Sequence, residues 1–306
     1  LFLFQNMFIE DVSQSTFFTI GKVFSIVYLI SAVVGWIGNG LIVAVTIRSK
    51  KLRGPCNILI ALQAFSDIIM QIGHVPFAYF AFSEMLISFR SCWKINFIFL
   101  ITVDVSTLLM FFIALDRLIA AKRPQLYKNL NPNLYMGGII IICLVYCTIF
   151  KVVTYLTLTE ERTICLIGQA VTGLSLQIWL GCSAMVNFAV VGLYYALTKV
   201  LKNTSASEYH KINRSLATMI LVYIFGWLMT MFGCSIALFV SPNQRVFTAF
   251  EIPLGTFANI NLAAPFFIYY FRSTLYKKEF LKLFGCAART STVTTTSHHD
   301  SSCNRD

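Results

Sequence analysis

The stretch from Cys92 to Tyr127 reads CWKINFIFLITVDVSTLLMFFIALDRLIAAKRPQLY. An α-helix rises about 1.5 Å per residue and a bilayer core takes roughly 20 residues, so the apolar run from Trp93 to Leu115 is long enough to cross a membrane. The run ends in Asp116 and Arg117, which a basic, proline-containing segment follows. Charge at the hydrocarbon boundary must be paired or solvated, so this pair needs a role.

The composition agrees with a membrane protein. The chain is 57% hydrophobic and 12% charged, with a mean hydropathy of +0.73. A soluble domain usually carries about twice that charge, so most of this chain does not face water. The net charge of +11 does not indicate nucleic-acid binding, because Lys and Arg form short clusters between apolar runs, as expected beside membrane spans.

The chain contains seven long apolar runs joined by short connections, which predicts an all-α, integral membrane bundle of seven helices. No connection is long enough to fold as a separate domain, so residues 1–284 form one domain. The predicted spans are 20–47, 57–82, 92–121, 133–158, 170–200, 211–240 and 246–271.

Lys and Arg gather in the connections after the first, third, fifth and seventh runs. Cytoplasmic connections are enriched in these residues, so we expect an extracellular amino terminus, a cytoplasmic carboxyl terminus and a multi-pass location in the plasma membrane. After the last run, residues 273–284 have the pattern of an amphipathic helix on the inner membrane surface, and Cys286 is a palmitoylation candidate. The tail, residues 285–306, is rich in Ser and Thr and is predicted to be disordered; it is either a phosphorylated, arrestin-binding segment or merely polar.

The nine cysteines do not form a disulfide framework. Four lie inside apolar runs and three lie on the basic side, which leaves Cys92 and Cys165 for the oxidising side. Two free thiols are the alternative to a disulfide between them. The chain has neither a paired CxxC motif nor HExxH, so the sequence indicates no metal site. It also shows no pair of nucleophile and base that would indicate an enzyme.

Short motifs recur in a fixed order along the runs. They are GNGLIV with Asn39, KLRGPCN, LQAFSD with Asp67, Asp116-Arg117-Leu118 with Pro124 and Tyr127, YIFGW with Trp227, and NLAAPFFIYYFRSTLYKKEF. Cys92 and Arg117 stand 25 residues apart. In these motifs and their spacing the chain resembles the rhodopsin-like (class A) G-protein-coupled receptors over all seven runs. The FFIYYFRS form of the last motif resembles the nematode serpentine chemoreceptors of the Srsx type.

The resemblance assigns a switch to the inner end of the third run. It implies that Asp116 and Arg117 pair in the resting receptor and that Arg117 is released on activation to face a heterotrimeric G protein, with Pro124, Tyr127 and Tyr269 in the same machinery. Glu208 is an alternative partner for Arg117. It also implies a disulfide between Cys92 and Cys165.

The resemblance further implies an intramembrane polar site. Asp67 is an acid in mid-span, and Ser106 and Asn261 match positions that bind a sodium ion with it in relatives. Asn39, in the motif of the first run, is a further member of the candidate polar site. Ala264 occupies the position of a second asparagine in relatives. Two interpretations of the site therefore stay open: it binds a sodium ion that acts allosterically, or it is a hydrogen-bonded polar cluster with water.

Candidate residues for the ligand pocket follow from the same comparison. Trp227 would form the floor, or it is only a large core residue. The position at which amine receptors carry an aspartate is Phe99, and Val103, Asp104 and His74 are the further candidates, with Lys151 left either satisfied in the bundle or snorkelling.

Two functions are consistent with this pattern. The first is a receptor for an extracellular small molecule or peptide, chemosensory or not, that activates a G protein. The second is a small secondary transporter, which would predict internal repeats and broken spans.

Helix bends are a further point of comparison with the family. Met229 occupies the position of the proline that bends the sixth helix in relatives, and Pro265 offers a break in the seventh helix.

Overall fold

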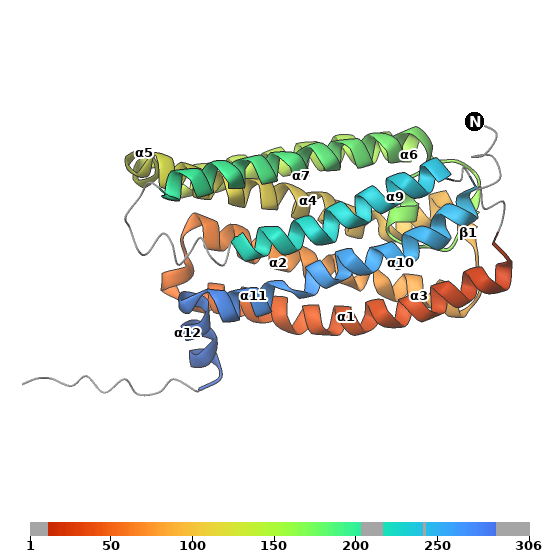
Figure 1. Ribbon diagram of the computed structural model, residues 1–306, viewed down its shortest axis with the longest axis horizontal. Coiled ribbons are helices and arrows are strands. Elements are labelled where there is room, and N and C mark those ends of the chain that lie inside the picture. Colours follow the sequence, from red (N-terminus) through yellow and green to blue (C-terminus); the bar gives the residue numbers. More distant parts are fainter. Residues whose placement is uncertain (1–11, 203–216, 241–242, 286–306) are drawn as a thin grey trace, which may run out of the picture.

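The computed structural model describes residues 12–202, 217–240 and 243–285. Its long helices run side by side as an elongated bundle (Figure 1). Within the described residues, six helices are long and apolar enough to cross a membrane, and a pair bent by 40° makes a seventh. The fold class therefore agrees with the predicted all-α bundle of seven spans.

The first two spans begin at residues suited to helix starts. α1 (Gln14–Arg48) is capped by Ser13, whose hydroxyl accepts a hydrogen bond from the backbone of Thr16, and it begins six residues before the predicted boundary. The short helix η2 (Lys50–Leu52) follows, and α2 (Pro55–Ile72) has its proline in the first turn, where no backbone donor is needed.

The second span is not the continuous helix that the sequence predicted. It divides at Gly73 into α2 and α3 (His74–Phe82). A Cβ atom at Gly73 would lie 2.7 Å from the Ile167 side chain and 2.9 Å from the ring of Phe99, so the break lets neighbouring elements approach closely. Pro76 follows and has no N–H to donate to the backbone of Ile72, which weakens the helix at the same place.

The third span, α4 (Phe89–Lys122), is the centre of the bundle. In the most apolar 18-residue stretch of α4, 61% is buried inside the bundle. The corresponding share is 28% for α6 (Pro132–Leu156) and 28% for the helix Gly173–Leu201. A short helix that the sequence did not predict, α5 (Pro124–Asn129), follows α4, and Asn131 caps α6. α4 therefore positions side chains against most of its neighbours.

A two-stranded sheet and a buried loop cover one end of the bundle. β1 (Ile87–Ser88) pairs antiparallel with β2 (Arg162–Thr163), and the helical turn η3 (Gly168–Ala170) follows. The disulfide between Cys92 and Cys165, with Cα atoms 5.3 Å apart, joins this loop to α4 and confirms the predicted bridge. We call residues 164–171 the lid, because this segment covers the end of the bundle. Nearly all of its apolar side chains are buried.

The last spans contain two departures from a regular helix. After α7 (Gly173–Lys202), the described part of the sixth span contains the π-helical segment η4 (Ile224–Leu228), which leads into α9 (Met229–Val240). A π-segment can bend a helix without proline, and this one ends directly before Met229, the position of the proline in the resemblance described above. α10 (Gln244–Ala263) and α11 (Pro265–Arg272) form the bent pair, with the break at Pro265, as predicted.

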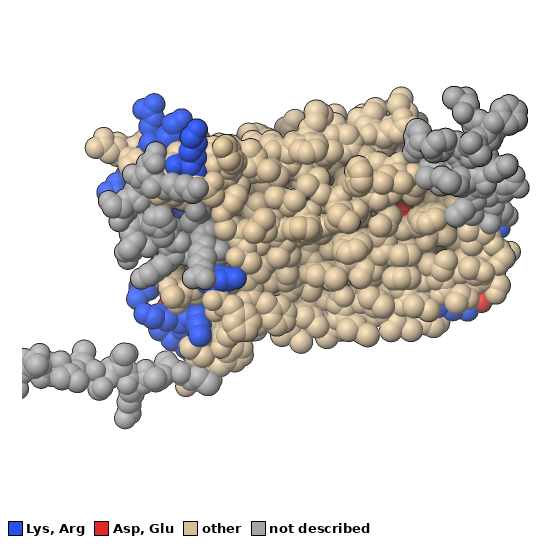
Figure 2. Space-filling model, viewed as in Figure 1, with Lys and Arg blue, Asp and Glu red and all other residues tan. Residues whose placement is uncertain are grey.

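The surface has the distribution expected of a protein in lipid. Large apolar side chains are exposed along the bundle, with Ile37 63% and Phe232 67% exposed. In Figure 2 the side of the bundle is almost free of charge, and Lys and Arg gather at one end. We call this end the basic end. The opposite end holds the two-stranded sheet and the disulfide, and we call it the disulfide end. α12 (Thr274–Leu283) lies crosswise at the basic end, where the sequence predicted a surface helix over 273–284 (Figure 1).

Candidate functional site

Three side chains meet at the basic end of α4, and we call them the basic-end cluster: Asp116, Arg117 and Tyr127. Asp116 is fully buried, and its Oδ2 atom accepts a hydrogen bond from Nε of Arg117 at 2.9 Å. The Arg117 side chain is 17% exposed, so its guanidinium reaches the edge of the bundle. A charge pair with one member at the surface can exchange partners without leaving that member dehydrated.

Tyr127 of α5 completes the cluster from outside the span. Its hydroxyl donates to Oδ1 of Asp116 at 3.0 Å and accepts from Arg117 at 3.1 Å. Partial burial and the nearby carboxylate of Asp116 raise the pKa of Tyr127 above its ordinary value, so the phenol keeps the proton that it donates. Pro124 sets this geometry by starting α5. Glu208, the alternative partner for Arg117, lies outside the described residues.

Tyr269 lies elsewhere at this end. It is buried in α11 with its ring 4.7 Å from that of Tyr276 in α12. Its hydroxyl has no hydrogen bond to any residue that the structure describes. The bent seventh span is thus joined to the surface helix through the contact between these two tyrosine rings, which are tilted by 32°.

The predicted polar site is only partly assembled. Ser106 donates to Asp67 at 2.8 Å, and both residues are buried. Asn39 donates to the backbone of Leu262, which joins α1 to α10. Asn261 faces the sixth span instead, since a Cβ atom on Gly226 would lie 2.7 Å from its own Cβ. Asp67 and Ser106 are therefore the members of the predicted site that the structure brings together, and Ala264 can supply no side-chain oxygen.

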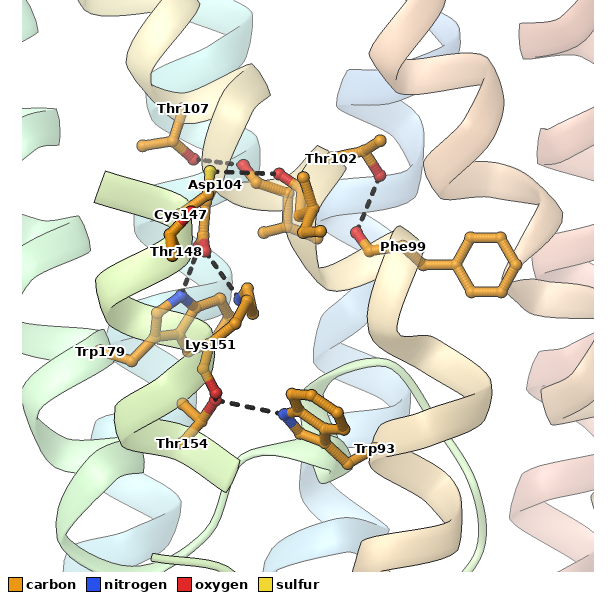
Figure 3. A network of polar contacts seen from close by, with 12 residues as sticks. Trp93, Phe99, Thr102, Asp104, Thr107, Cys147, Thr148, Lys151, Thr154 and Trp179 are labelled. Atoms are coloured by element: carbon orange, nitrogen blue, oxygen red, sulfur yellow. Dashed lines mark hydrogen bonds and ion pairs between the residues drawn. The ribbon is translucent and has the colours of Figure 1, made fainter. Parts of the chain in front are cut away.

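Asp104 does not face a ligand cavity as the sequence predicted. Its Oδ2 atom lies 2.7 Å from Nζ of Lys151 in α6, and its Oδ1 atom accepts a hydrogen bond from the indole of Trp179 in α7 at 2.8 Å (Figure 3). The side chains of Asp104 and Lys151 are 2% and 5% exposed. We call these three residues the buried triad. It is a three-helix connection, because an acid this deeply buried needs a cation and a donor.

Further polar contacts extend this connection toward the disulfide end. The indole of Trp93 in α4 donates to Thr154 of α6 at 3.2 Å, and Thr154 donates to the backbone of Lys151 at 3.0 Å (Figure 3). The ion pair with Asp104 holds the Lys151 side chain inside the bundle, so this lysine does not snorkel to a surface. The sequence alone had left both possibilities open.

A cavity of about 90 Å³ lies between the helices near the disulfide end, and we call it the deep cavity. Val103, Trp227 and His74 line it, as predicted for a ligand pocket. Phe99 is not one of its lining residues, because its ring packs against the Gly73 break. Trp227 lies in the π-segment, so the floor of the cavity is the irregular part of the sixth span.

Comparison with known proteins agrees with this arrangement. The family model of the serpentine type seven-transmembrane G-protein-coupled chemoreceptor Srsx matches residues 32–284. The chain belongs to this family. The receptor is also similar to individual G-protein-coupled receptors, over parts of their length.

Prokineticin receptor 1 of Homo sapiens is 33% identical over 120 residues, which are 38% of this receptor and 30% of that protein. The probable G-protein coupled receptor npr-8 of Caenorhabditis elegans is 28% identical over 114 residues, 35% of this receptor and 22% of that protein. Neuropeptide Y receptor type 4-2 of Homo sapiens is 33% identical over 129 residues, 40% and 33% of the two chains. The match spans about a third or less of these relatives, and nothing in it supports the transporter alternative.

Sequence reasoning missed one acid that lines the deep cavity of the receptor. Glu251 of α10 accepts a hydrogen bond from the side-chain amide of Gln169 in the lid. Glu251 stands alone as a charged residue within the apolar run of the last span, and a lone acid in mid-span is the signal that identified Asp67.

Proposed function

We propose that the receptor binds an extracellular ligand in the deep cavity and activates a heterotrimeric G protein at the basic end. The observation that supports this most directly is the basic-end cluster, in which the buried Asp116 holds the partly exposed Arg117. Two arrangements of such a pair give two conformations of the helix end. A ligand that binds one conformation better shifts the population toward it.

The orientation is part of the proposal. The basic end would face the cytoplasm and the disulfide end the extracellular side, because Lys and Arg are retained on the cytoplasmic side and disulfides form on the oxidising side. The amino terminus is then extracellular. Glycosylation of a sequon appended at the amino terminus, together with protection of a carboxyl-terminal epitope in intact cells, tests this directly.

A test of coupling needs no identified ligand. Asp116→Asn removes the charge that holds Arg117, so we expect ligand-independent nucleotide exchange on a co-expressed G protein to rise several-fold above wild type. Adding Arg117→Ala to Asp116→Asn should return exchange to the background of cells without receptor. Arg48→Ala, which removes another exposed cation at the same end, is the matched control and should keep the elevated exchange.

Surface expression of each variant is measured in parallel by labelling of intact cells. The proposal fails if Asp116→Asn and the double variant give equal exchange at equal surface levels across a panel of G-protein α subunits.

The finer assignments extend the same proposal. The name of the family supports a chemosensory ligand, and the names of the relatives support a peptide ligand. Cys286 and the tail lie outside the described residues, and palmitoylation, phosphorylation and arrestin binding there are proposed from sequence alone. Sodium at Asp67 and Ser106 is proposed as an allosteric ion.

A further inference from the structure

The charges lining the deep cavity do not balance. Among the residues that the structure describes, Glu251 is the acidic residue of its lining, and neither Lys nor Arg lines it. No Lys or Arg of the described residues forms an ion pair with Glu251. An acid beside an apolar cavity normally has a cation partner, as Asp104 has in Lys151.

The contacts of Glu251 leave part of the carboxylate unoccupied by protein donors. One oxygen accepts from Gln169, which is 1% exposed, and Gln169 accepts in turn from Gln244 at 2.6 Å. The other oxygen lies against Gly168, where a Cβ atom would overlap it. Glu251 therefore reaches the lid at a residue without a side chain.

A second polar group faces the same cavity without a strong partner. His74 is 3% exposed, and neither ring nitrogen has a hydrogen bond of normal geometry within the described residues. Its ring lies 4.9 Å from that of Tyr28, and Asn259 is the polar side chain that interacts with it. A buried imidazole without a hydrogen bond is costly unless something supplies one.

We propose that Glu251 and His74 bind a small cationic amine with a compact apolar body, the ammonium on Glu251 and the body between Trp227 and the lid. This rests on the proposed function and names the class of its ligand. The rest of the lining is largely apolar, including Met70, Leu176 and Leu180. At about 90 Å³ the cavity is smaller than the roughly 150 Å³ apolar cavity that holds benzene in an engineered protein, so the body is no larger than benzene.

A second cavity, of about 390 Å³, lies at the disulfide end and is lined in part by Thr163 and Gln244; we call it the mouth cavity. Gln244 and Thr163 both donate to Gln169, and Gln169 donates to Glu251, so these hydrogen bonds join the linings of the two cavities. An arriving ammonium competes with the Gln169 amide for the carboxylate of Glu251.

The test uses three isosteric probes on the purified full-length receptor in lipid nanodiscs: 2-methylpropan-1-amine, 2-methylpropan-1-ol and 2-methylpropanoate. We expect the amine alone to raise the melting temperature in a saturable way. Glu251→Gln keeps the acceptor for Gln169 and removes the charge, and it should weaken amine binding by about tenfold or more. Glu161→Gln removes an acid from the mouth cavity and should leave amine binding unchanged.

Three outcomes overturn the inference: an equal shift with the alcohol, amine binding that survives Glu251→Gln, or loss of amine binding in Glu161→Gln alone. The probe series on the unsubstituted receptor keeps the test decisive if Glu251→Gln does not fold. Amine binding without ligand-stimulated exchange would refute only the proposed coupling, and exchange in Asp116→Asn without amine binding would refute only the amine site.

Discussion

The buried triad and the basic-end cluster are built from the same chemistry and differ in burial. Each joins an acid on α4 to a cation and to an aromatic hydrogen-bond donor, Trp179 in the triad and Tyr127 in the cluster. Lys151 is 5% exposed, whereas Arg117 is 17% exposed and stands at the end of a helix.

Under the proposed function, this difference gives the two sites opposite roles. Separating Asp104 from Lys151 would leave two charges in a dehydrated interior, so the triad holds α4, α6 and α7 in one arrangement. Arg117 can turn toward water or a partner protein while Asp116 keeps the hydrogen bond of Tyr127. One site fixes the bundle and the other can change, and four substitutions test this contrast in order of expected effect.

Lys151→Met should have the largest effect. It leaves the carboxylate of Asp104 buried without a cation, which costs about 3–5 kcal/mol of folding free energy, measured as a fall in melting temperature and surface expression. The double variant Asp104→Asn with Lys151→Met should recover most of that loss. Lys22→Met, which breaks the exposed pair with Glu84, should cost less than about 1 kcal/mol. Equal losses at Lys22 and Lys151 would contradict the fixed role of the triad.

Trp179→Phe should come next. It removes the hydrogen bond from the indole to the charged Asp104 and should cost about 1.5–3 kcal/mol in thermal unfolding. Trp93→Phe removes the bond to the neutral Thr154 and is the matched comparison, with an expected cost of about 0.5–1.5 kcal/mol. A larger loss at Trp93 than at Trp179 would show that the charge of Asp104 does not dominate this interface.

Asp116→Asn should reduce stability less than either triad variant, by about 1 kcal/mol, because Arg117 can reach solvent and the new amide oxygen still accepts a hydrogen bond. Its melting temperature should fall slightly while its basal exchange rises. Glu160→Gln, in the exposed pair with Arg90, should change neither quantity. A fall as large as that of Lys151→Met would mean that the basic-end cluster is also a fixed element.

Tyr127→Phe should have the smallest effect. It removes the hydrogen bond that the hydroxyl donates to Asp116 and the one that it accepts from Arg117, and it should raise basal exchange modestly, with a loss of stability of about 0.5–1 kcal/mol. Tyr195→Phe, at a tyrosine that is 70% exposed, is the control and should match wild type. Basal exchange that falls in Tyr127→Phe would indicate that the tyrosine supports the active arrangement instead.

The sequence by itself determined the class of this protein. Runs of apolar residues, basic clusters between them and one pair of cysteines on the oxidising side are local features, so they predicted the seven spans and the disulfide between Cys92 and Cys165. The pairing of Asp116 with Arg117 was implied by the resemblance to the rhodopsin-like receptors, and the structure contains it. The break at Gly73 was missed, because nothing in the apolar run shows that Ile167 and Phe99 approach there.

Only the tertiary structure decided which intramembrane polar residues meet. Asp104, Lys151 and Trp179 come from three different helices, and Glu251 meets a glutamine from the lid. A span in lipid is apolar on both its inward and its outward face, so hydrophobic periodicity does not reveal which way a polar residue points. The rotation of each helix, which packing against its neighbours sets, paired Asp104 with Lys151 and left Glu251 at the cavity without a cation.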